Sequence, residues 1–153
     1  MSPEAQEQCR KVDVVTVKGS TIPMPVYTYD TFQDQMFPEL HPPKFCDLGL
    51  VEVLTQMAEE YDSQTLWKTD QDLVQLNRLV TPAFQKLFNE GLACYLSGNW
   101  TMARKLLEKA DETMQANGDK RGDGPSRTLL SYMQAENWTV PADWKGCRPL
   151  TRK

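Results

Sequence analysis

The side chains that most often perform chemistry are few in this sequence of 153 residues, and they do not group. The only histidine is His41, and no nucleophile stands in a pattern that would pair it with this imidazole. The cysteines are Cys9, Cys46, Cys94 and Cys147, without the close pairs that a zinc site needs. No glycine-rich phosphate loop occurs either. The sequence therefore predicts no catalytic residue, no metal site and no cofactor, with free thiols in an intracellular compartment.

The C-terminal segment 138–153 has the residue types of a protein contact rather than of a reaction. Two tryptophans and several cations stand close together here, and large aromatic side chains dominate the energetics of interfaces. The candidate partner-binding residues are Trp138, Trp144, Lys145 and Arg148. The alternative, that both indoles simply cover the chain's own helical core, stays open.

The composition bounds the class of protein. With 40% hydrophobic and 25% charged residues, the chain resembles a soluble globular domain. No apolar run approaches the ~20 residues of a membrane span, and the net charge of -4 argues against a general nucleic-acid binder. We expect a cytoplasmic chain of one domain, or one domain plus an appendage, with protein partners, no nucleic acid and no direct membrane insertion.

The segment 84–116 predicts two packed antiparallel helices. Apolar and small residues recur every three or four positions, Gly98 ends the first helix, and Asn99 can cap the second. Small residues stand where the helices must approach closely, and large ones where the gap opens. The packing positions are Gly91, Tyr95, Gly98, Trp100, Ala103, Leu107 and Ala110.

The spacing of these positions resembles one tetratricopeptide repeat. The match covers about a fifth of the chain, and no second copy stands about 34 residues away on either side. Because a lone repeat cannot bury its own face, we expect it to pack on helices from elsewhere in the chain or on a partner. An ordinary helical hairpin with convergent spacing is the alternative.

Flanking segments of the chain can supply the apolar faces on which this helical hairpin would pack. Helical periodicity recurs at 47–61, at 70–80 and after Asp123-Gly124-Pro125. We expect a mainly α fold, a tetratricopeptide-like hairpin packed with flanking helices, plus an N-terminal β-hairpin. The expected order is a β-hairpin at 1–30, a proline-rich linker at 31–45, a helical module at 46–137 and an extended, basic, tryptophan-rich tail at 138–153.

The segment 12–30 predicts two strands, with β-branched residues before a turn at Gly19 and an extended pattern after it. Two strands alone are marginal in water, which suggests a larger sheet. The motifs are Val17-Lys18-Gly19 and Pro25-Val26-Tyr27. They resemble the last two strands of a class III adenylate or guanylate cyclase catalytic domain. The resemblance implies that Lys18 contacts the terminal phosphates of a nucleotide; a solvated turn lysine is the alternative.

The C-terminal region from residue 123 onward carries a third resemblance. Its motifs are Asp123-Gly124-Pro125-Ser126 and Asp143-Trp144-Lys145-Gly146. They look like a C-terminal module of large cyclase-containing signalling proteins of unicellular eukaryotes, in which the module follows the catalytic domain together with a hairpin like 88–103. A class III cyclase needs two metal-binding aspartates on an early strand, and we expect this chain to begin after them.

The resemblance implies a non-catalytic regulatory or scaffolding C-terminal module of a nucleotide cyclase, which is a lyase. Such a module would act through contacts with a protein partner or with the parent's own catalytic domain. It would lie in the cytoplasm, on the cytoplasmic side of a membrane protein, or in the cilium. The alternative is a structural or adaptor subunit of a large assembly, such as an axonemal or membrane complex, with a degenerate cyclase-like end.

Overall fold

The computed structural model describes residues 8–20, 22–30, 49, 52, 55 and 69–150. The chain divides into two compact units, one made of Met1–Asp30 with Arg78–Lys153 and one made of Thr31–Asn77. In the second unit, helix α4 (Gln71–Asn77) begins where the Asp70 carboxylate accepts a hydrogen bond from the Leu73 N–H. The predicted linker at 31–45 and most of the helix predicted at 47–61 lie outside the described residues.

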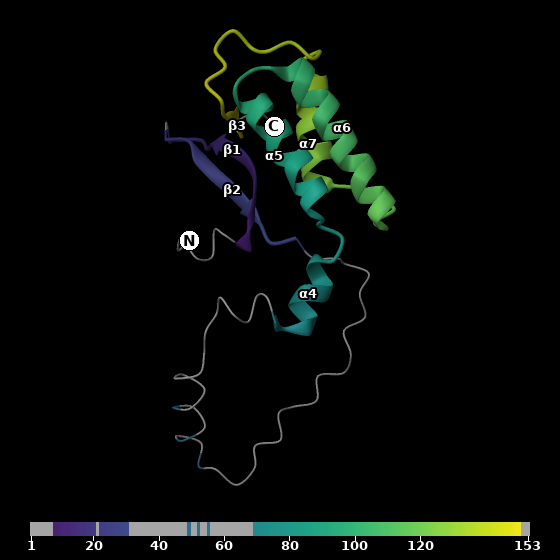
Figure 1. Cartoon of the computed structure of the whole chain (residues 1–153). Helices are drawn as coiled ribbons and strands as arrows, with labels where there is room; N and C mark the ends of the chain where they lie inside the picture. The colour runs from purple at the N-terminus through teal and green to yellow at the C-terminus, as the bar shows by residue number, and fades with distance from the viewer. Residues whose placement is uncertain are drawn as a thin grey trace. The chain divides into compact units, whose positions relative to one another are not determined.

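The first unit is mixed α/β, with packing dominated by helices. Its helices are α5 (Pro82–Leu96), α6 (Trp100–Asn117) and α7 (Gly124–Ala135). Its strands are β1 (Arg10–Thr16), β2 (Met24–Thr28) and β3 (Arg148–Pro149). Figure 1 shows the strands beside α5, with α6 and α7 on its other side.

Local capping chemistry explains where α5 and α6 begin and end. Thr81 caps α5 by accepting the Phe84 N–H, and Pro82 fills the first helical position, where no N–H is needed. The helix ends at Leu96, and Gly98 follows it with a φ of 83°, the left-handed conformation that glycine adopts without strain. Asn99 then accepts the Met102 N–H and starts α6. The predicted helical hairpin is therefore present, and two short-range caps make its turn.

The hydrophobic core lies between α5, α6 and α7. Ala103, Leu107 and Ala110 of α6 are fully buried, as are Phe84 and Phe88 of α5. Helix α7 completes this core with Leu129 and Met133. The apolar face that the hairpin cannot bury by itself is thus covered by a helix of the same chain.

The sheet has the strand order β2-β1-β3, which the sequence did not predict in full. Strands β1 and β2 form the expected antiparallel hairpin, with one extra residue on β1 between Lys11 and Asp13. The tail supplies the third strand, since β3 pairs in parallel with β1 and the Leu150 N–H donates to the Thr16 carbonyl at 2.9 Å. A segment expected only to be extended therefore stabilises a hairpin that would be marginal alone.

Replacing Gly91 with leucine is expected to lower the free energy of unfolding by about 1–3 kcal/mol, because the crossing of α5 and α6 has no room for a side chain. A Cβ at Gly91 would lie 3.0 Å from Cγ and Cδ2 of the buried Leu107. Urea denaturation measures the change. The exposed Ala93 on the same helix is the control, and Ala93→Leu should stay within about 0.5 kcal/mol. Equal values for the two variants would contradict the close crossing.

Candidate functional site

Four aromatic rings form a cluster between the helical hairpin and the tail: Tyr95, Trp100, Tyr132 and Trp144. Tyr95 and Trp100 stack with ring centroids 5.9 Å apart, and Trp144 meets both edge-on at 5.1 and 5.3 Å. The Trp144 Nε1–H also donates to the Leu96 carbonyl at 3.1 Å. The structure therefore places Trp144, a predicted partner-binding residue, against the chain's own core.

The phenol oxygen of Tyr95 is buried and has no hydrogen-bond partner among the residues that the structure describes. Burial raises the pKa of Tyr95 well above its ordinary value, and the nearby Asp13 carboxylate adds to the rise. A phenol held so firmly in its neutral form is a poor proton donor or acceptor near neutral pH. Tyr95 is thus a packing residue of the hairpin, as its spacing predicts.

Arg148 is also engaged within the chain. Its guanidinium donates from Nε to the Asp13 carboxylate at 2.9 Å and lies 5.6 Å from the Tyr132 ring centroid. The side chain of Asp13 is 6% exposed, so this carboxylate depends on Arg148 for compensation. The ion pair fixes β3 beside β1. It leaves Lys145 as the member of the predicted tail site that is exposed.

A buried ionic cluster that the sequence did not reveal joins the start of β1 to the start of α7. Both carboxylate oxygens of Asp30 and both of Asp123 accept hydrogen bonds from the Arg10 guanidinium, at 2.6–3.1 Å. The guanidinium also lies 4.8 Å from the Phe84 ring centroid and 4.2 Å from that of Phe88. Burial alone would lower the pKa of Arg10, but its hydrogen bonds to the two aspartates raise it overall.

Lys18 lies in the turn between β1 and β2. This turn is closed by a hydrogen bond from the Ser20 N–H to the Val17 carbonyl, with Gly19 at a φ of 87°. Lys18 is exposed, and no hydrogen bond or ion pair within the described ranges joins it to the tail. The structure does not bring Lys18 together with the tail residues, and its contact with a nucleotide phosphate stays a prediction.

Among the residues that the structure describes, two exposed features remain as candidate contact surfaces. The first is a row of apolar residues along the outer strand of the described sheet, Ile22, Met24 and Val26, which are 72%, 44% and 37% exposed. Met24 pairs with Val15 across the ladder, so its side chain lies on the face where Val15 is buried. The helices therefore cover this face over β1 but leave β2 uncovered. We call Ile22, Met24 and Val26 the β2 row.

The second feature is a groove beside α6, lined by Trp100, Thr101, Arg104, Lys105, Glu108 and Trp138. Trp138 lies just after α7, where the Trp138 N–H donates to the Met133 carbonyl at 2.7 Å. Its indole ring stacks on the Arg104 guanidinium at 4.0 Å. We call these six residues the α6 groove. Of the predicted tail residues, Trp138 is the one that borders it.

Within the described part of the chain, no three acidic, histidine or cysteine side chains are arranged to hold a metal ion. None of the helices described is both long and apolar enough to cross a membrane. Comparison with protein-family models, with curated proteins and with solved structures finds no match to this chain.

Proposed function

We propose that this chain is a non-catalytic regulatory or scaffolding module that acts through protein–protein contacts in association with a nucleotide cyclase. In this proposal the α5–α6 pair is a tetratricopeptide-like hairpin that serves as a rigid frame. The module works in the cytoplasm, on the cytoplasmic side of a membrane protein, or in the cilium. The observation that carries the proposal is the β2 row, a strip of exposed apolar side chains along the outer strand of the described sheet.

The geometry of the sheet favours contact through β2. Strand β1 pairs with β2 along one side, and along the other side it pairs with β3 at Val15 and Thr16. Strand β3 spans two residues, whereas β2 spans five and is therefore the longer edge. A strand from the cyclase catalytic domain could add beside β2 by main-chain hydrogen bonds, with its apolar side chains covering the β2 row. This would complete a sheet of which β1 and β2 are the end.

In the same proposal, Lys18 lies near the catalytic domain of the partner but takes no part in catalysis. Docking through β2 would carry the β1–β2 turn, and with it the exposed Lys18 ammonium, toward the partner. An ammonium in such a position can neutralise part of a polyphosphate. The chemistry itself would belong to the partner, in keeping with a module that is not itself an enzyme.

The proposal is tested by mixing the chain with the purified catalytic domain of a class III cyclase and following hydrogen exchange. The expected result is protection of the β2 amides on binding, with at least a roughly tenfold loss of affinity in Met24→Lys, since a desolvated cation would face an apolar surface. Met102 on α6 is a matched control, because it is 45% exposed where Met24 is 44%. Unchanged binding by Met24→Lys, or equal losses in Met102→Lys, would contradict docking through β2.

One observation favours the alternative of an adaptor subunit of a large assembly. The β-hairpin is bound within its own chain, by β3 and by the Arg10 cluster, as in a self-contained unit. If the catalytic domain does not bind at all, while the chain co-purifies with an axonemal or membrane complex through the β2 row, the adaptor function is the better one.

A further inference from the structure

We propose that the α6 groove binds a short acidic segment of a partner protein, whose carboxylates are held by Arg104 and Lys105. This inference goes beyond the proposed function, because the α6 groove includes no residue of the sheet. It depends on three features of the groove: its fixed walls, its free hydrogen-bond donors, and its charge.

The walls of the groove are held in place before any ligand arrives. Trp100 is 2% exposed, and its Nε1–H donates to the Tyr95 carbonyl at 3.2 Å. Asn137 and Trp138 have φ angles of 53° and 60°, a left-handed conformation that is rare for a bulky residue such as tryptophan. Backbone held in such a conformation is concentrated at binding and functional sites. Because these walls are already ordered, little conformational entropy is lost when a ligand binds.

The donors of Arg104 point to an anionic ligand. Its Nε–H donates to Glu108 at 2.8 Å, and its guanidinium face is covered by the Trp138 indole. These two contacts fix the plane of the guanidinium, while its terminal nitrogens have no hydrogen-bond partner in the described part of the chain. A guanidinium held in this way presents its free N–H groups to a carboxylate in a bidentate geometry.

The charge of the groove selects an acidic peptide over a nucleic acid. Arg104 and Lys105 provide two cations against the single carboxylate of Glu108, a local excess of one positive charge. Two cations can form ion pairs with one or two carboxylates. The net charge of the whole chain is -4, which would repel a long polyanion such as a nucleic acid. The groove volume of about 320 Å³ suits a few side chains of an extended segment rather than an enclosed small molecule.

The test uses a fluorescein-labelled peptide of six Glu-Ser repeats, with a peptide of six Gln-Ser repeats as the neutral probe. Fluorescence anisotropy should show binding of the acidic peptide below about 1 mM and no binding of the neutral one. Arg104→Glu and Lys105→Glu should each weaken binding at least about tenfold, because a repulsive charge replaces an attractive one. Added salt should weaken binding as well, since both cations are exposed.

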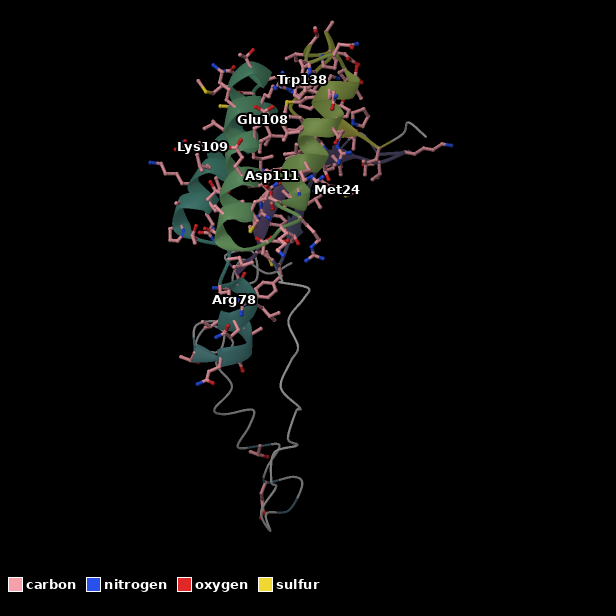
Figure 2. All side chains as sticks on the ribbon, turned by 90° about the vertical axis from the view of Figure 1, so that its right-hand side faces the viewer. Met24, Arg78, Glu108, Lys109, Asp111 and Trp138 are labelled. Carbon is pink, nitrogen blue, oxygen red and sulfur yellow. The ribbon has the colours of Figure 1, made fainter. Side chains whose placement is uncertain are left out.

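Lys109→Glu is the matched control, because Lys109 is an exposed cation of the same helix that does not line the groove (Figure 2). It should weaken binding less than about threefold, through the change in net charge alone. Equal losses in Lys105→Glu and Lys109→Glu would overturn the inference, as would equal binding of the two peptides or no binding at about 1 mM. Met24→Lys should bind the acidic peptide like the unaltered chain, so failure of the groove and failure of docking through β2 can be told apart.

Discussion

Replacing Arg10 with methionine is expected to lower the free energy of unfolding by about 3–5 kcal/mol, the cost of removing one partner from a buried ionic cluster. Arg10 is the cation that faces both Asp30 and Asp123, and the side chain of Asp123 is 3% exposed. Methionine preserves much of the packing against Phe84 and Phe88. The loss should therefore come from two carboxylates left in a poorly hydrated site. Urea denaturation followed by circular dichroism measures it.

Arg104→Met provides the control for this loss. Arg104 also forms an ion pair with a carboxylate and also stacks on an aromatic ring, but the side chains of its pair with Glu108 are 47% and 45% exposed. Its removal should cost less than about 1 kcal/mol, because exposed pairs contribute little. Adding Asp30→Asn to Arg10→Met should recover part of the stability, since it removes one uncompensated charge. A cost below about 1 kcal/mol for Arg10→Met would show that the cluster does not hold β1 on the helices.

The helical hairpin was predictable because its signals are local. Thr81-Pro82 at the start of α5, and Gly98 followed by Asn99 between the helices, are capping residues that act within a few positions. The apolar spacing of α5 and α6 also identified the buried face, from Phe84 through Leu107. Capping residues and helical periodicity depend on residues that are close together in the chain, so both can be recognised in a single sequence.

The contacts that join the tail and the β-hairpin to the helices were not predictable in the same way. The hydrogen bond from Arg10 to Asp123 spans 113 positions, and the one from Arg148 to Asp13 spans 135. Neither residue type nor spacing indicates such pairs, because any surface arginine has the same local pattern. This is why Arg148 could be predicted as a partner-binding residue although the structure places its guanidinium on Asp13.

The placement of the tail bears on function. Trp144 and Arg148 are engaged within the chain, whereas Trp138 borders the α6 groove and Lys145 is exposed. In the described part of the chain, the two surfaces proposed for a partner are then the β2 row and the α6 groove, one apolar and one basic. Surfaces of different chemistry discriminate between partners, and two such surfaces agree with the proposed scaffolding role.

Trp100→Ala is expected to cost about 3–5 kcal/mol, as for other buried tryptophans replaced by alanine. Trp100 is 2% exposed and contacts the rings of Tyr95, Tyr132 and Trp144 at centroid distances of 5.3–5.9 Å. Its loss would leave a cavity at the point where the helical hairpin, α7 and the tail meet. Thermal and urea unfolding measure the cost.

Trp138→Ala is the control for Trp100→Ala, because the Trp138 indole is half-buried, packs at the edge of the core and stacks on Arg104. It should cost about 1 kcal/mol in stability, the scale of a partly exposed cation–π contact, while weakening binding of the acidic peptide. Trp100 and Trp138 line the same groove, yet the first is expected to be needed for folding and the second mainly for binding. Equal losses of stability in the two variants would mean that Trp138 belongs to the core as Trp100 does. The α6 groove would then be less accessible to a ligand than we infer.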